Sequence, residues 1–229
     1  MTVYDVAPRL PDVARLRELC RALAVLEVVL APDSRDRYHQ YDPAWRPGEE
    51  VAIARNGAGD EYAIVFTAAG VYVRGFDHES PMSPHATDDG EPWPGVLDSV
   101  PEVFRAQLDE PAFGDGYGTP HVTVCLWREP QDDAWRHGVI DFPAGDFPAG
   151  GDQDGADWLF GLLTDGTAEA ARDWARDYYE QPVDLDAVRH LYAGRPLTDE
   201  VVTALNPATT RAAIADEISR IGYPLAAPA

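Results

Sequence analysis

The chain has 229 residues, which suits one domain of ordinary to large size or one domain with a helical extension. Hydrophobic residues make up 45% and charged residues 25%, a composition that excludes a wholly disordered tail, a collagen-like fibre and a disulfide scaffold. The 40 acidic residues outnumber the 18 basic residues, all of them arginine, and give a formal net charge of −22. Because this charge repels phosphate groups and anionic lipids, we expect no direct contact with nucleic acid or membranes.

The two cysteines point to a reducing compartment. Cys20 falls in a helical apolar pattern and Cys125 in a strand pattern, so both are expected to be buried thiols. The first ten residues lack the basic and apolar regions of a signal peptide, and no apolar run approaches the roughly 18 residues of a membrane helix. The sequence therefore predicts a cytoplasmic protein, and no cofactor is expected.

The N-terminal third changes from helical to strand periodicity. Residues 12–30 carry apolar side chains at helical spacing behind Asp12, which can cap the helix. Residues 33–50 are polar and aromatic with two prolines, which predicts a long loop. Residues 51–76 alternate with a period of two around glycine-containing turns, as antiparallel strands do.

The middle of the chain is rich in proline, glycine and aspartate. Between 77 and 120 only residues 97–108 favour a short helix. Residues 121–127 alternate as a strand, and residues 135–142 are expected to form the second arm of its hairpin. A short tandem repeat of Phe-Pro-Ala-Gly within 141–151 is expected to lie in a surface loop.

The C-terminal third predicts helices, because caps and stops agree with apolar spacing over 156–163, 168–180, 185–193, 199–205 and 208–221. On the second of these, the expected inward stripe is Ala171, Trp174, Ala175 and Tyr178. The element order predicts an α+β fold with an N-terminal helix, a central antiparallel sheet of about four to six strands and about four to five C-terminal helices. We expect an α+β domain with long loops over 1–164 and a helical extension over 165–229 packed on it, or one single domain that includes both.

Few residue patterns indicate catalysis. A chain without lysine has no Walker motif, and its glycine-rich turn at 56–60 lies between strands. No Gly-x-Ser-x-Gly elbow is present, so no catalytic residue is assigned. The aspartates at 152–157 miss the glycine and glutamate positions of a calcium loop and suit the start of a helix. His78, Glu79 and His85 are weak candidate ligands for zinc or manganese, and a solvated loop explains them as well.

The segment 51–79 carries a family resemblance. Its turn Asn56-Gly-Ala-Gly-Asp60, the following hairpin and the end Phe76-Asp-His-Glu79 resemble the central strands of SUKH-type immunity proteins. Residues 157–163 are similar to the helix that closes such domains. The resemblance implies an α+β domain that binds and neutralises a toxin of bacterial competition systems. The chain as a whole also resembles a bacterial family that implies no activity.

Three hypotheses follow. The preferred one is an acidic, immunity-like module that captures a basic partner protein, with a contact surface of Asp60, Glu61, Asp77, Glu79, Trp45 and Trp93. The second is a metal-dependent hydrolase that uses His78, Glu79 and His85. The third is a structural or regulatory domain of a larger assembly.

Overall fold

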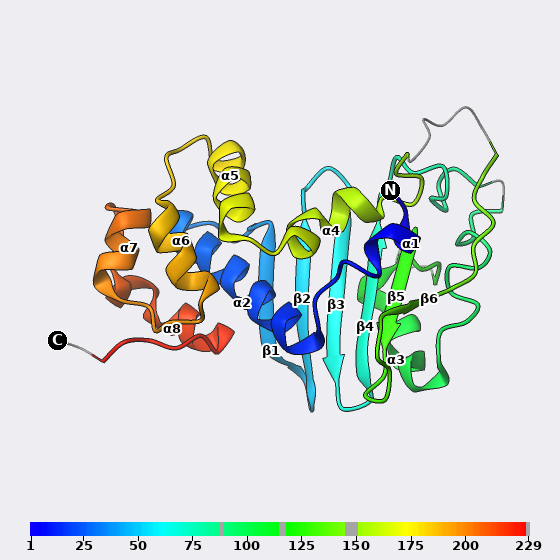
Figure 1. The fold of residues 1–229 in the computed structure, drawn as a ribbon, viewed down its shortest axis with the longest axis horizontal. Helices are drawn as coiled ribbons and strands as arrows, with labels where there is room; N and C mark the ends of the chain where they lie inside the picture. The colour runs from blue at the N-terminus through cyan, green and yellow to red at the C-terminus, as the bar shows by residue number, and fades with distance from the viewer. Residues whose placement is uncertain (88, 115–117, 145–150, 228–229) are drawn as a thin grey trace.

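The computed structural model describes residues 1–87, 89–114, 118–144 and 151–227 and shows the expected α+β fold (Figure 1). The sheet is a six-stranded antiparallel meander in which spatial order follows chain order. Its strands are β1 (His39–Arg46), β2 (Glu49–Arg55), β3 (Glu61–Thr67), β4 (Gly70–Phe76), β5 (Val124–Arg128) and β6 (Arg136–His137). The helices are α1 (Val3–Val6), α2 (Val13–Leu30), α3 (Arg105–Leu108), α4 (Ala156–Asp165), α5 (Ala168–Tyr179), α6 (Leu185–Tyr192), α7 (Asp199–Leu205) and α8 (Arg211–Ile221).

Helix α2 forms the centre of the molecule. It begins at the predicted cap, where Asp12 accepts a hydrogen bond from the backbone N–H of Arg15. Every residue from Ala22 to Leu30 is buried, because α2 packs on the sheet with one side and on α6, α7 and α8 with the other. Cys20 is buried and unpaired, as is Cys125 in β5, which confirms the expectation of free buried thiols.

The two faces of the sheet have different covers. On one face, Tyr62 packs against Phe160 of α4, and the guanidinium of Arg17 in α2 lies over Phe66. On the opposite face, the segment between β4 and β5 places Phe104 beside Tyr72. That segment contains short 3-10 turns at Glu102–Phe104 and Pro111–Phe113 around α3, within the range where a short helix was predicted.

The prediction of a loop over 33–50 is wrong, since β1 lies within it. His39 and Tyr41 point inward and are buried, whereas Gln40 and Asp42 are exposed. The alternation is hard to recognise in the sequence because the segment contains Pro43 and several polar residues. A proline is tolerated here because β1 is an edge strand. Pairing with β2 therefore makes this segment a strand, although its composition favours a loop.

The observed bounds of other strands and helices also differ from the predicted bounds. The ladder of β5 begins at Val124 rather than at residue 121, and the arm expected over 135–142 pairs only at Arg136–His137. The last helix begins at Arg211, three residues later than predicted. The second copy of the tandem repeat lies outside the described residues. Among the described residues, no helix combines the length and apolar character that crossing a membrane requires.

Candidate functional site

The most distinctive surface of the protein is an acidic flank beside β4. Two segments, 75–104 and 137–171, contain no arginine but hold fourteen of the 40 acidic residues. They therefore account for 14 of the 22 excess negative charges within 65 of the 229 residues. Sequence composition alone carries this signal, although only the structure shows that the two segments meet.

Three contacts join these segments. The indole N–H of Trp93 donates to the carbonyl of Asp141 at 2.9 Å, and the Ser80 hydroxyl donates to the carbonyl of Gln153 at 2.6 Å. Gly155, in the left-handed region at φ 75°, is so close to Asp77 that a Cβ there would lie 2.4 Å from the Asp77 Cβ. The loops occupy the right-hand side of Figure 1, beyond β4 and β5.

Ten carboxylates of these segments form no ion pair with any described residue. Eight of them, without the buried Asp154 and without Asp165 at the end of α4, are called the acidic flank. They are Asp77, Glu79, Asp89, Glu91, Asp98, Glu102, Asp141 and Asp152. Six are exposed, while Asp77 and Asp152 are half-buried. The two segments supply no arginine of their own, whereas fourteen of the 18 arginines, all of them elsewhere in the chain, form ion pairs with acidic side chains.

Burial and, after it, neighbouring carboxylates raise the pKa values of two groups at the base of the flank. Burial, followed by the nearby charges of Asp60 and Asp152, raises the pKa of Asp77. Burial also raises the pKa of Asp152, against the hydrogen bonds that it accepts from the backbone N–H groups of Asp157 and Trp158. A cation placed beside these groups would relieve the repulsion, which is the chemistry that this surface offers.

Asp154, behind the flank, has a structural role. Its carboxyl is fully buried and accepts hydrogen bonds from the backbone N–H groups of Val3 at 2.8 Å and Ala156 at 3.1 Å. Burial raises its pKa to about 7. These bonds cover backbone donors at the starts of α1 and α4, which agrees with the predicted role of the aspartates over 152–157.

Asp60 and His78 form a pair at the edge of the flank. Asp60 accepts hydrogen bonds from the backbone N–H of His78 at 3.0 Å and from its Nδ1 at 2.7 Å. Burial acts to raise the pKa of Asp60, but the hydrogen bonds from His78 and Asn56 outweigh it and lower that pKa. The same hydrogen bond raises the pKa of the exposed His78 imidazole.

Asp60, Asp77 and His78 are the one group in the described chain with three potential metal-binding side chains, whose ligand atoms lie within 4.8 Å of one another. Neither Glu79 nor His85, the other two candidates from the sequence, belongs to this group. His85 instead packs its ring against Phe76 and His121, at centroid distances of 5.6 and 5.2 Å. The three candidates from the sequence therefore do not converge on one ion.

Glu61 and Trp45 are occupied by contacts within the protein. Glu61 pairs with Arg55 on the surface and with the buried guanidinium of Arg74. Trp45 stacks on Phe113 at 5.7 Å, with the Arg46 guanidinium 4.4 Å from its ring centroid. Six residues are predicted to contact a partner. Of these, Asp77, Glu79 and Trp93 lie on the arginine-free segments and Asp60 borders them. Glu61 and Trp45 lie elsewhere.

Exposed apolar side chains border the flank, although no sequence motif marks them. Val139 is 86% exposed and Trp158 is 55% exposed. Tyr4, also exposed, packs edge-on against Phe142, and its hydroxyl accepts a hydrogen bond from the backbone N–H of Ile140 at 2.7 Å. Exposed aromatic and aliphatic groups inside a charged rim are typical of a protein-binding surface.

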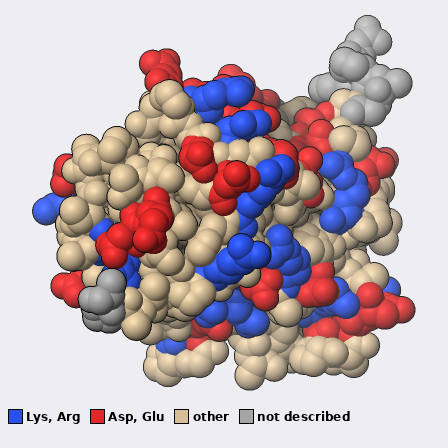
Figure 2. Space-filling view, turned by 60° about the vertical axis from the view of Figure 1, so that its left-hand side comes forward, with Lys and Arg blue, Asp and Glu red and all other residues tan. Residues whose placement is uncertain are grey.

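The side of the molecule that carries the C-terminal helices and β1 has a different charge pattern. Arginine and acidic side chains alternate there, and arginines form a band across the middle of the view (Figure 2).

Comparison of the chain with protein families, curated proteins and solved structures finds no match. The site must therefore be interpreted from its own chemistry.

Proposed function

We propose that this protein is a cytoplasmic, acidic protein-binding module that captures a basic partner protein through the acidic flank. The observation that carries the proposal is the set of eight unpaired carboxylates beside exposed Trp158, Val139 and Tyr4. Uncompensated charge steers an oppositely charged protein toward the surface, and apolar anchors hold it after contact. The resemblance of residues 51–79 to SUKH-type immunity proteins favours a toxin as that partner.

The experiment compares two variants with the same change in charge. Glu79→Gln, Glu91→Gln and Asp141→Asn remove three exposed carboxylates of the flank for which no side-chain hydrogen bond is described. Asp36→Asn, Glu180→Gln and Asp216→Asn remove three from other parts of the surface and serve as the matched control. Each protein is immobilised, and partners are captured from lysate of the source cells at low and at high salt.

The proposal expects a basic protein that is retained by the wild type and the control but lost with the flank variant. With that protein purified, association at low salt should slow about tenfold in the flank variant and should weaken steeply as salt is added. Equal association rates for the flank variant and the control would refute the proposal. Failure of both wild type and control to retain any basic protein would also count against it.

Divalent-cation binding is a second candidate, favoured by the group of Asp60, Asp77 and His78. Two carboxylates and one imidazole are ligands that zinc and manganese accept. In titrations of the purified protein with each ion, His78→Ala should abolish binding, whereas His85→Ala should leave it unchanged. Equal binding by both variants would place the ion elsewhere, and a silent titration would remove this candidate.

A further inference from the structure

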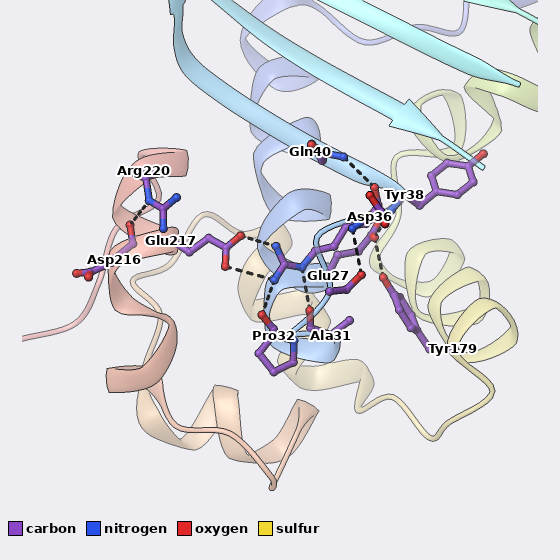
Figure 3. Close-up of polar contacts among 12 residues, drawn as sticks. Glu27, Ala31, Pro32, Asp36, Tyr38, Gln40, Tyr179, Asp216, Glu217 and Arg220 are labelled. Atoms are coloured by element: carbon purple, nitrogen blue, oxygen red, sulfur yellow. Dashed lines mark hydrogen bonds and ion pairs between the residues drawn. The ribbon is translucent and has the colours of Figure 1, made fainter. Parts of the chain in front are cut away.

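A second surface feature lies far from the acidic flank, at the free edge of the sheet. A hollow of about 760 Å³ opens between β1 and α8, with Ala24 and Val28 of α2 among the residues that line it. Its size falls in the range of ligand-binding clefts. Figure 3 shows part of its polar wall, where Glu217 of α8 reaches toward the chain that enters β1 and Arg220 lies on the same helix beside Asp216.

Arg37 connects the parts of this wall. Its guanidinium forms an ion pair with Glu217 and donates to the carbonyls of Ala31 and Pro32, each at 2.9 Å. Gln40 donates from its side-chain amide to the Arg37 carbonyl at 3.1 Å. These contacts connect α8 with the end of α2 and with the chain that enters β1 (Figure 3).

Two arginines of the hollow have no acidic partner. Among the described residues, only Arg35, Arg128, Arg195 and Arg220 form no ion pair, and Arg35 and Arg220 line this one hollow. Arg220 donates only to the backbone carbonyl of Asp216, at 3.3 Å. Asp33 and Asp42 also line the hollow without an ion pair. Carboxylates without an ion pair are common in this chain, whereas such guanidinium groups are few, so the two arginines favour a ligand that carries carboxylates.

The edge of β1 offers backbone groups to the same ligand. The N–H of Arg55 bonds to the carbonyl of Tyr38, and the register pairs His39 with Ala54 and Tyr41 with Ala52. In an antiparallel pair, bonded and non-bonded positions alternate, so the Tyr41 N–H and carbonyl and the His39 carbonyl point away from β2. No described residue donates to or accepts from these three groups.

From these observations we propose that the hollow binds a short, extended acidic peptide segment, which adds to the edge of β1 and places its carboxylates on Arg35 and Arg220. The peptide would pair with the backbone at Tyr41, as in other cases of β-strand addition. Pro43 has no N–H, so pairing ends there and the edge cannot support long strands. The β1 residues that line the hollow run from His39 to Ala44 and span about 17 Å, which fits a peptide of about six residues.

This site is independent of the proposed capture of a basic partner, and salt distinguishes the two. The six charged residues that line the hollow (Asp33, Arg35, Arg37, Asp42, Glu217 and Arg220) sum to zero. Added salt screens the attraction of the exposed Arg35 and Arg220 for the peptide, but it also screens the repulsion between an acidic peptide and a chain of net charge −22, so the affinity should change little. Binding of a basic partner to the flank should instead weaken steeply.

The test uses a fluorescent six-residue peptide of alternating valine and glutamate, and the same peptide with glutamine in place of glutamate. Fluorescence anisotropy should show binding of the acidic peptide to the full chain. Arg35→Gln together with Arg220→Gln should weaken it about tenfold. Arg195→Gln, another exposed arginine without an acidic partner, should leave the affinity unchanged. Hydrogen exchange of the Tyr41 amide should slow when the acidic peptide is bound.

Four results would overturn the proposal. The first is no binding of the acidic peptide, and the second is equal affinity for the glutamine peptide or for the double variant. The third is complete competition by inorganic phosphate with no protection of the Tyr41 amide, which would assign the hollow to small anions. The fourth is protection of that amide without peptide in a concentration-dependent dimer, which would assign the edge to a second copy of the chain.

Discussion

The carboxylate of Glu27 in α2 accepts two hydrogen bonds from His39 in β1, one from its backbone N–H at 2.7 Å and one from its ring Nδ1 at 2.5 Å. Glu27 is fully buried and also accepts from the Tyr38 backbone N–H and the Tyr179 hydroxyl, each at 2.7 Å. Figure 3 shows Tyr179 of α5 pointing at this carboxylate. One acidic side chain thus connects α2, β1 and α5.

Replacing Glu27 with glutamine should destabilise the fold. The amide of Glu27→Gln brings a donor to a place where four donors already converge, so at least one buried donor loses its acceptor. We expect a loss of about 3 kcal/mol in the free energy of unfolding, measured with urea. Glu180→Gln, on the surface just after α5, is the matched control and should change stability by less than about 0.5 kcal/mol. Equal stability of the two variants would contradict this role for Glu27.

Asp154 should make the protein less stable as pH rises. Its folded-state pKa of about 7 lies above the ordinary value of 3.8, so the folded state holds a proton that the unfolded state has lost. Stability from this group is therefore present at acidic pH and decreases between about pH 4 and 7, by about 4 kcal/mol over the full range.

The variant Asp154→Asn isolates this effect, because asparagine does not titrate. The difference in unfolding free energy between wild type and variant, measured with urea from pH 5 to 8, should shift in favour of the variant as pH rises. A difference that stays constant over this range would show that Asp154 does not hold a proton in the folded state.

The pair of His78 and Asp60 predicts a measurable titration. Its hydrogen bond raises the pKa of His78 above 6.5, and Asp60→Asn should move it back toward that value. NMR of the imidazole protons measures this directly. Because the folded-state pKa of His78 is raised, the contribution of the pair is complete below pH 6.5 and disappears as pH rises through the folded-state value. Asp77→Asn should lower the pKa of His78 less, since Asp77 acts through its charge alone.

Local signals predicted the helices well. Thr167, Asp184 and Thr198 directly precede three of the predicted helices, and each accepts a hydrogen bond from a backbone N–H three residues later. Trp174 and Tyr178 stack on each other at 5.2 Å, but Tyr178 is 44% exposed and does not belong to an inward stripe. Helical spacing places side chains on one face, whereas burial depends on which elements cover that face.

Long-range contacts explain what the sequence could not predict. Gly155 approaches Asp77 from a distant part of the chain, and Arg74 neutralises Glu61 across two strands. Neither contact has a sequence signature, so buried and surface carboxylates could not be distinguished. The absence of arginine from 75–104 and 137–171 was visible, but its importance depends on how the two segments pack.

The same change, glutamate to glutamine, should reduce stability strongly at Glu61 and hardly at all at Glu79. Glu61→Gln leaves the buried Arg74 guanidinium without its carboxylate, which should reduce the free energy of unfolding by about 3 kcal/mol. Burial acts to raise the pKa of Glu61, but the charge of Arg74 outweighs it and lowers that pKa, so the stabilisation is present above pH 4.5 and lost on acidification. Glu79→Gln, on an exposed side chain without an ion pair, should change stability by less than about 0.5 kcal/mol. Urea unfolding at pH 7 checks both, and a Glu61→Gln variant as stable as the wild type would mean that Glu61 is free to bind a partner after all.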